Sequence, residues 1–402
     1  GAGTAAGVVT GSAASFEQVA DLVHAADTSA ADAGPAEDAQ PLVEGETAAD
    51  WKDPPGTTSI TVFDTFAPAL GEAFARARDA RRVLYGYVEH DVTTTYLGST
   101  TGLRLRHEQP TGHVGVTGKS DDLARSAWVG QATRDFSDVD ALALDDELAR
   151  RLGWAERAVD LPAGRYETLL PPTSVADLLI YLYWSASGRD AFDGRSVFSR
   201  AGGGTRVGES LSPHDLRLFS DPTLPGLECS PFVTAPQSTA ELSVFDNGLP
   251  VHATDWVRGG ELASLLQTRH SAALTSLPVT PAVDNLALSV DGGAGSVDDL
   301  VARTERGLLL TCMWYIREVD PQTLLLTGLT RDGVYLVENG EVTGAVNNFR
   351  FNESPVDLLG RFSEAGSTVP TISREWGDYF PRTAMPALRI PDFNMSSVSQ
   401  AS

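Results

Sequence analysis

Residues 324–351, LLLTGLTRDGVYLVENGEVTGAVNNFRF, constrain the fold more than any other stretch of the chain. They consist of short β-prone runs separated by Asp, Asn and Gly, which is the pattern of strands joined by turns. Asn339 and Gly340 stand between two of these runs, and Asn-Gly favours a tight hairpin because both central residues need a positive φ. A second Asn-Gly pair, in SVFDNGLPV at residues 243–251, predicts another hairpin. The sequence therefore predicts three consecutive strands here and a second half rich in antiparallel sheet.

The first half of the chain mixes helical and strand patterns. Helical spacing of apolar residues recurs in three segments, residues 15–26, 65–82 and 139–151. Ser15 and Gln18 have capping-box spacing at the start of the first helix, and Asp64 is the expected cap of the second. Residues 82–120 then alternate with period two, which predicts a meander of short antiparallel strands.

An acidic stretch at residues 27–55 has few apolar side chains, which predicts a solvated loop. We therefore predict an α+β protein with two domains. Residues 1–155 are expected to form an N-terminal domain of helices on an antiparallel sheet. Residues 156–402 are expected to form a β-rich C-terminal domain with a curved antiparallel sheet and helices.

Composition narrows the possible partners and compartments. A formal net charge of −24 repels phosphate backbones and argues against a nucleic-acid partner. Either this charge attracts a basic partner or peptide, or it reflects an acidic surface without a specific ligand. Two cysteines exclude a disulfide framework and favour a reducing compartment. Because we find no secretory signal at the start and no apolar run of about 18 residues, we expect a cytoplasmic protein without membrane spans.

HEQPTGH, at residues 107–113, contains the residue types of a zinc-protease helix at the wrong spacing. His107 and His113 are six residues apart, and Pro110 between them interrupts a helix. We therefore predict a hairpin loop here rather than a metal site. The nearby GVTGKS resembles a phosphate-binding loop, but His113 stands where that motif needs its first glycine.

The remaining reactive side chains form no catalytic set in the sequence. Cys229 and Cys312 have no histidine near them in sequence and are expected to be small buried hydrophobes. His252 and His270 are candidates for meeting across a hairpin, although two scattered histidines rarely bind a metal. No G-x-S-x-G nucleophile motif is present.

Three long segments carry a resemblance to a known family. They are LPAGRYETLLPPTSVADLL, SPFVTAPQSTAELSVFDNGLPVHATDWVRGGEL and residues 307–359, which begin GLLLTCMWYIREVD. In this order they resemble the TldD/PmbA family, also called TldD/TldE, and the similarity extends over most of the chain. From the abrupt start GAGTAAGVVTGSA we expect the first strands of the family's N-terminal domain to be missing from this sequence.

The resemblance implies a zinc peptidase made of two related subunits that cleaves unstructured or modified peptides. TldD-type subunits carry HExxxH on a helix and a cysteine near the C-terminus, whereas TldE (PmbA) types lack this set. The metal helix falls on the apolar segment VADLLIYLYWSASG, for which Thr173 or Ser174 is the expected N-cap. Ile180 and Ser185 replace the two histidines and Tyr181 replaces the glutamate, and no cysteine follows Cys312.

This chain therefore resembles the TldE-type, non-catalytic subunit, with no cofactor of its own and with zinc expected in a TldD-type partner. Tyr183 and Trp184 either pack in the core or contact that partner. Peptide is expected to add as a strand at a sheet edge within residues 327–351. The candidate peptide-binding side chains there, which are otherwise solvated turn residues, are Arg331, Asn347, Asn348 and Arg350. The alternatives are a stand-alone hydrolase with an unrecognised active site and a binding scaffold without turnover.

Overall fold

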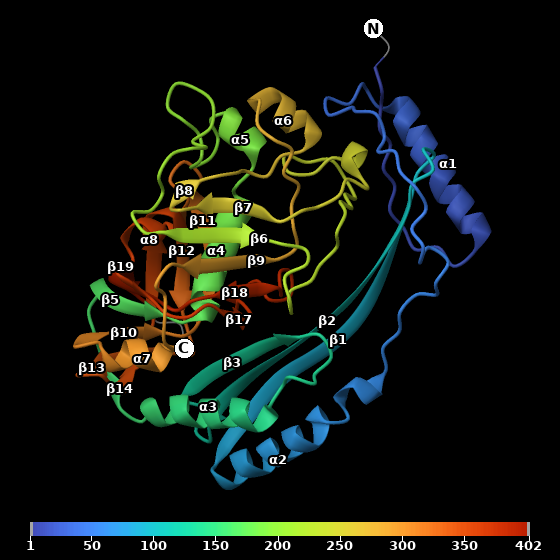
Figure 1. Ribbon diagram of the computed structural model, residues 1–402. Helices are drawn as coiled ribbons and strands as arrows, with labels where there is room; N and C mark the ends of the chain where they lie inside the picture. The colour runs from blue at the N-terminus through green and yellow to red at the C-terminus, as the bar shows by residue number, and fades with distance from the viewer. Residues whose placement is uncertain (1–2, 400–402) are drawn as a thin grey trace.

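The computed structural model describes residues 3–399, and its most extended feature is a long hairpin (Figure 1). β1 (Arg82–Gly98) and β2 (Arg104–Ser120) are each 17 residues long and pair along their whole length without a register shift. β3 (Ser126–Thr133) pairs antiparallel with the second half of β2 and completes a three-stranded sheet. The predicted antiparallel meander is confirmed, but its strands are long rather than short.

The HEQPTGH segment lies inside β2, so the prediction of a hairpin loop there is wrong. Pro110 is paired with Val92 of β1, whereas β3 ends opposite Gly112. At Pro110, past the end of β3, β2 has no strand partner on that side among the described residues, and a proline nitrogen is tolerated there. Pairing along the whole hairpin overrides the local turn preference of Pro-Thr-Gly, because strand preference depends on context.

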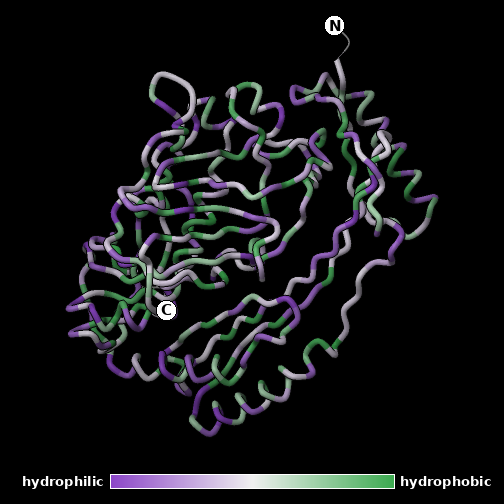
Figure 2. Tube along the Cα trace, in the orientation of Figure 1, coloured by the Kyte–Doolittle hydropathy of each residue, from purple (hydrophilic) through white to green (hydrophobic). Residues whose placement is uncertain are grey.

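Helices cover the outer face of this sheet (Figure 1). They are η1 (Ile60–Phe63), α2 (Phe66–Asp79) and α3 (Ala141–Trp154). Alternate residues of β2 from Gly112 onward are buried, and Val114 and Val116 pack with Phe66 and Leu148 of the helices. Figure 2 shows the resulting alternation of hydrophobic and hydrophilic residues along these strands.

The helix boundaries in this half differ from the predictions in detail. Thr65, not Asp64, is the N-cap of α2, because Asp64 ends the preceding 3₁₀ turn. α1 (Phe16–Asp32) continues six residues past its predicted end at Ala26 and takes in the start of the acidic stretch. Ser15 caps α1 as predicted by accepting from the Gln18 N–H, whereas the Gln18 side chain accepts from Ala14.

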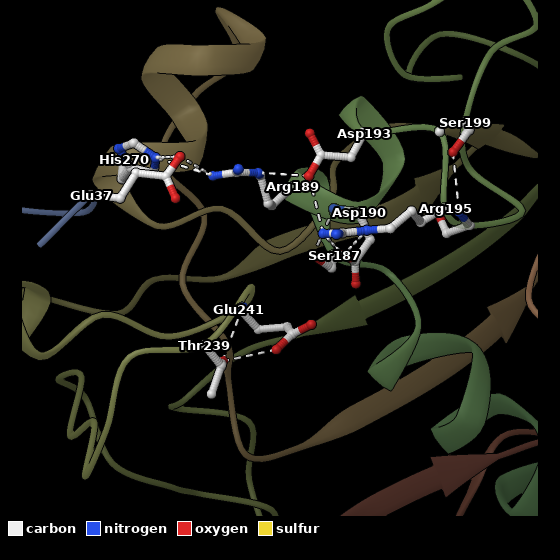
Figure 3. Close-up of polar contacts among 12 residues, drawn as sticks. Glu37, Ser187, Arg189, Asp190, Asp193, Arg195, Ser199, Thr239, Glu241 and His270 are labelled. Carbon is white, nitrogen blue, oxygen red and sulfur yellow. Dashed lines mark hydrogen bonds and ion pairs between the residues drawn. The ribbon is translucent and has the colours of Figure 1, made fainter.

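The acidic segment after α1 contacts the C-terminal half through Glu37 (Figure 3) and Asp38. Glu37 accepts from Arg189 of α5 (Gly188–Phe192) at 3.0 Å, and Arg189 also lies 3.3 Å from the ring of His270 in α6 (Arg269–Thr275). Asp38 accepts from the hydroxyls of Ser238 and Ser243, both at 2.6 Å. Residues 33–55 contain no helix and none of them is buried, so the predicted loop is found here, although Glu37 and Asp38 contact partners far along the chain.

The C-terminal half contains two sheets. The larger consists of β4 (Ala158–Val159), β5 (Gly164–Leu170), β10 (Arg306–Leu310), β11 (Met313–Asp320), β12 (Leu325–Thr330), β13 (Val334–Glu338), β14 (Glu341–Val346), β15 (Phe349–Glu353), β16 (Glu364–Ala365) and β19 (Leu388–Val398). The smaller consists of β6 (Leu216–Ser220), β7 (Thr254–Arg258), β8 (Glu261–Leu262), β9 (Leu286–Val290), β17 (Val369–Thr371) and β18 (Thr383–Met385). Shorter helices accompany them, η2 (Val244–Asp246), α7 (Val297–Ala302) and α8 (Pro355–Arg361).

Strand order in the larger sheet is β11-β12-β15-β19-β5-β10-β13-β14-β4, with β16 on β19. The sequence prediction of three consecutive strands in residues 324–351 therefore missed one, and β12 pairs with β11 and β15 rather than with β13. The predicted hairpin at Asn339 and Gly340 is confirmed as the β13–β14 turn. The hairpin predicted at Asn247 and Gly248 is wrong, because the 3₁₀ turn η2 precedes them instead of a strand.

Gly340 offers a test of this turn. Its φ is +83°, and a Cβ there would lie 2.8 Å from the carbonyl oxygen of Ala302. Gly340→Ala is expected to lower the free energy of unfolding by about 2–3 kcal/mol in chemical denaturation, from backbone strain plus this clash. Gly194→Ala is the matched control, because Gly194 has a φ of +78° with open space around it, and should cost about 1 kcal/mol. Equal losses in the two variants would contradict the clash.

Candidate functional site

α4 (Pro172–Trp184) is the helix on which the family resemblance places a metal site. Pro172 occupies its first turn and Pro171 is the N-cap, so the predicted N-cap at Thr173 or Ser174 is wrong by two or three residues. A helix that is apolar on all sides belongs in an interior, and α4 packs into the core cluster shared by both C-terminal sheets (Figure 1). Buried Ser174 donates its hydroxyl to the Leu310 carbonyl of β10 at 2.8 Å, which fixes the helix against the larger sheet.

The three residues predicted to stand in place of the family's two histidines and glutamate are engaged within the fold. Ile180 is fully buried in the core. The Tyr181 hydroxyl accepts the N–H of Glu318 in β11 at 3.3 Å, and the Ser185 hydroxyl donates to the Tyr181 carbonyl at 2.9 Å. An aliphatic chain, a phenol and a bonded serine do not fit a zinc ion, so no catalytic step at these positions runs through one.

Aromatic side chains gather at the C-terminal end of α4. The Trp376 ring lies 5.5 Å from Tyr181 and 5.3 Å from Trp184, and Phe380 lies 6.2 Å from Trp184, as centroid distances. Trp184 remains 37% exposed, whereas Tyr183 is buried and its hydroxyl bonds to the Val283 backbone. Of the two residues predicted either to pack in the core or to contact a partner, only Trp184 reaches the surface in this chain.

The segment at residues 373–380, which we call the strap, crosses α4 and is held by Asp177. The Glu375 N–H donates to Asp177 Oδ1 at 2.8 Å, and the Trp376 indole donates to the Asp177 carbonyl at 3.1 Å. Asp177 is fully buried, and Oδ2 has no hydrogen-bond partner within residues 3–399. Burial therefore raises the pKa of Asp177 to about 8, which keeps this carboxyl protonated at neutral pH.

β11 is the edge strand of the larger sheet next to this site, but its outer edge is not free. Glu375 of the strap accepts the Tyr315 N–H at 3.0 Å and pairs with Arg317, and Tyr181 accepts the Glu318 N–H. A peptide could add as a strand here only after these side chains move away.

The strand edge predicted within residues 327–351 is not found on β12, β13 or β15, and it stays a prediction for β14, which pairs with β4 only at Ala345 and Val346. β12, β13 and β15 each have neighbours on both sides, so their backbone groups are already paired. Asn347 accepts the Leu161 N–H at 2.7 Å, Arg331 lies 3.4 Å from Asp332, and exposed Arg350 donates to Thr327. Asn348 accepts from Thr330 in the same region. The structure does not bring these four side chains into one pocket, and their binding of peptide stays a prediction.

Both cysteines are buried and unpaired, as predicted. Burial raises the pKa of the Cys229 thiol and of the Cys312 thiol to about 12, so neither is a thiolate nucleophile at neutral pH. His113 lies 3.5 Å from Asp378, His107 bonds to Gln109, and His270 lies beside Arg189. Among the side chains of residues 3–399, no group of three or more His, Cys, Asp or Glu is arranged to hold a metal ion.

A cavity of about 540 Å³ opens beside the end of α4, and no sequence pattern predicted it. Tyr183 and Trp184 line it together with segments that contain Phe232, Leu242, Gln267, Ala282 and Phe380. These segments are separated by tens of residues and share no motif, so only the folded chain brings them together. Another cavity of about 530 Å³ lies where β2 and β3 meet the C-terminal half, around Thr111, Arg134 and Arg382.

Two family models match the chain. One, described as the PmbA/TldA metallopeptidase central domain, covers residues 60–161, and the other, described as the PmbA/TldA metallopeptidase C-terminal domain, covers residues 163–397. The chain belongs to the PmbA/TldD metallopeptidase family. This confirms the family predicted from the three long segments, and the helices and sheets of the structure confirm the predicted α+β class. No protein with a curated function matches the sequence.

Solved structures with the PmbA/TldD fold resemble the whole chain. TldE from Thermococcus kodakarensis has a TM-score of 0.75 at 17% identity, covering 96% of this chain and 86% of that chain. A putative modulator of a DNA gyrase from Thermotoga maritima MSB8 has a TM-score of 0.74 at 17% identity, covering 93% and 83%. A putative modulator of DNA gyrase from Bacteroides thetaiotaomicron has a TM-score of 0.73 at 13% identity, covering 98% and 86%. At these identities the likeness shows the fold alone.

Within residues 3–399, no helix is both long enough and apolar enough to cross a membrane.

Proposed function

We propose that this chain is the non-catalytic subunit of a TldD/TldE-type zinc peptidase complex located in the cytoplasm. It would support a catalytic TldD-type subunit and help to hold unstructured or modified peptides. One observation carries the proposal. At the positions aligned with the metal site, Ile180 is buried in the core, Tyr181 is hydrogen-bonded to β11, and the Ser185 hydroxyl is hydrogen-bonded to the Tyr181 carbonyl of α4. The zinc chemistry would then belong to the partner subunit.

The closed edge of β11 is a second observation in favour of a non-catalytic role for this chain. Tyr181, at the aligned position of the family's catalytic glutamate, accepts the Glu318 N–H of β11, and a peptide strand added at this edge would need that N–H. Peptide contact by this chain would therefore involve side-chain pockets more than strand addition at this edge. Trp184, exposed at the end of the same helix, is our candidate for contact with the partner.

Metal content and partner capture test this proposal. Elemental analysis of the purified chain, after gentle removal of loosely bound metal, is expected to show far less than one zinc per chain. Purification of the tagged chain from its native host should retain a paralogue that carries HExxxH, and only the pair should cleave unstructured peptides. A full equivalent of zinc, or cleavage by the isolated chain, would instead identify a stand-alone hydrolase. A chain that binds peptide but captures no such paralogue would be a binding scaffold.

A further inference from the structure

We propose that the 540 Å³ cavity at the end of α4 binds the side chain of a lysine or arginine in an extended peptide. The inference rests on the proposed peptide-handling role and names the class of residue that this subunit selects. The charged side chains that line the cavity are all carboxylates, Glu241, Asp246 and Asp284, and no Lys, Arg or His of residues 3–399 lines it. Its volume lies within the range of about 300–1,000 Å³ found for small-ligand sites.

Glu241 is the carboxylate that remains available to a ligand. Asp246 pairs with Arg269 at 2.6 Å, and Asp284 pairs with Arg382 at 2.5 Å. Glu241 accepts a hydrogen bond from the Thr239 hydroxyl at 2.9 Å (Figure 3), and no cation within residues 3–399 forms an ion pair with it. A ligand cation can therefore pair with Glu241 without displacing a residue of the protein.

Aromatic walls suit the rest of such a side chain. Trp184 is 37% exposed and Tyr379 76% exposed, so both rings are accessible, while Phe232 and Phe380 are buried behind them. The alkyl stem of a lysine or arginine packs on apolar surface while its charged end reaches a polar partner. A cation close to a tryptophan or tyrosine ring also gains cation–π attraction.

Gln267 forms part of the wall without offering its side-chain oxygen to a ligand. Gln267 lines the cavity and is 1% exposed, and its Oε1 has no hydrogen-bond partner among the described residues. Its amide nitrogen already donates to the Thr275 hydroxyl at 2.9 Å. Because Gln267 Oε1 has less than 1 Å² of accessible surface, a ligand in the cavity does not reach it, and Glu241 is the acceptor that a ligand can reach.

Other side chains fit this cavity less well. An acidic side chain would meet three carboxylates and a chain of net charge −24, whereas that field attracts cations. A purely apolar side chain would cover the walls but leave Glu241 without a cationic partner after water is excluded.

Two peptides and three variants test the inference on the full chain without any partner. The probe is a blocked pentapeptide with one arginine among glycines, and the comparison peptide carries citrulline, which has nearly the same shape without the charge. Titration calorimetry is expected to show about tenfold tighter binding of the arginine peptide. Glu241→Gln should abolish this preference, and Glu261→Gln, at an exposed glutamate elsewhere, should retain it. Trp184→Ala should weaken binding of both peptides, because it removes a wall.

Equal affinity for the two peptides, or no binding of either by the unmodified chain, would overturn the inference. An unchanged preference in Glu241→Gln, with the variant folded by circular dichroism, would also overturn it. The two proposals can fail separately. Selective arginine binding by a chain that captures no HExxxH paralogue leaves the inference intact and removes the proposed complex. If the complex is functional but this chain binds the arginine and citrulline peptides equally, the proposed complex stands and the inference fails.

Discussion

Arg389→Met is expected to lower the free energy of unfolding by about 3 kcal/mol, because it breaks a buried ionic network. Arg389 is 8% exposed, and its guanidinium donates to Glu167 and Glu364 at 2.8 Å each. It also donates to the Thr304 hydroxyl at 2.6 Å and to the Leu300 carbonyl at 3.0 Å. The substitution would leave these acceptors without their donor where β19, β5 and α7 meet. Urea or guanidinium unfolding of the two proteins measures the difference.

Arg303→Met is the matched control for that network. Arg303 pairs with the same Glu364 but is itself 51% exposed. Exposed ion pairs contribute about 0–1 kcal/mol, so this variant should lose less than a third as much as Arg389→Met. A loss below about 1 kcal/mol for Arg389→Met would mean that water or neighbouring side chains satisfy the acceptors.

Asp177→Asn is expected to stabilise the protein increasingly as the pH rises from 4 to 8. Burial raises the folded-state pKa of Asp177 to about 8, against about 3.9 for an unfolded aspartate. The folded chain therefore binds this proton more tightly than the unfolded chain does. The stability that this provides is complete below pH 4 and is lost as the pH rises through the folded pKa. With these two pKa values, the unmodified chain is expected to lose about 5 kcal/mol over this window through Asp177 alone.

The amide of Asp177→Asn keeps the oxygen that accepts the Glu375 N–H and removes the ionisation. Denaturation curves at pH 4, 6 and 8 should therefore show a difference between variant and unmodified chain that is near zero at pH 4 and largest at pH 8. Asp79→Asn, at an aspartate whose side chain is 75% exposed, is the control and should not change with pH in this way. A constant difference across the three pH values would show that Asp177 does not titrate in this window.

Local sequence signals predicted those features that depend on a few neighbouring residues. The Asn339-Gly340 turn was predictable, since both residues adopt a positive φ that Asn and Gly tolerate best. The Ser15 cap and the burial of both cysteines were predictable for similar reasons. Signals of the same strength failed at Asn247-Gly248, where a 3₁₀ turn precedes the pair, and at Pro110, which lies inside a strand. Pairing partners from elsewhere in the chain decided both of these cases.

The sequence by itself determined the family, the α+β class and the absence of histidine and glutamate from the α4 segment, because these depend only on residue identity and order. Only the tertiary structure decided that Tyr181 and Glu375 close the edge of β11, that the strap is held by a buried aspartate, and that Glu241, Gln267 and Trp184 surround one cavity. These residues lie up to 198 positions apart, as in the bond between Asp177 and Glu375. Contacts at such separations depend on strand order and packing, which local preferences do not specify.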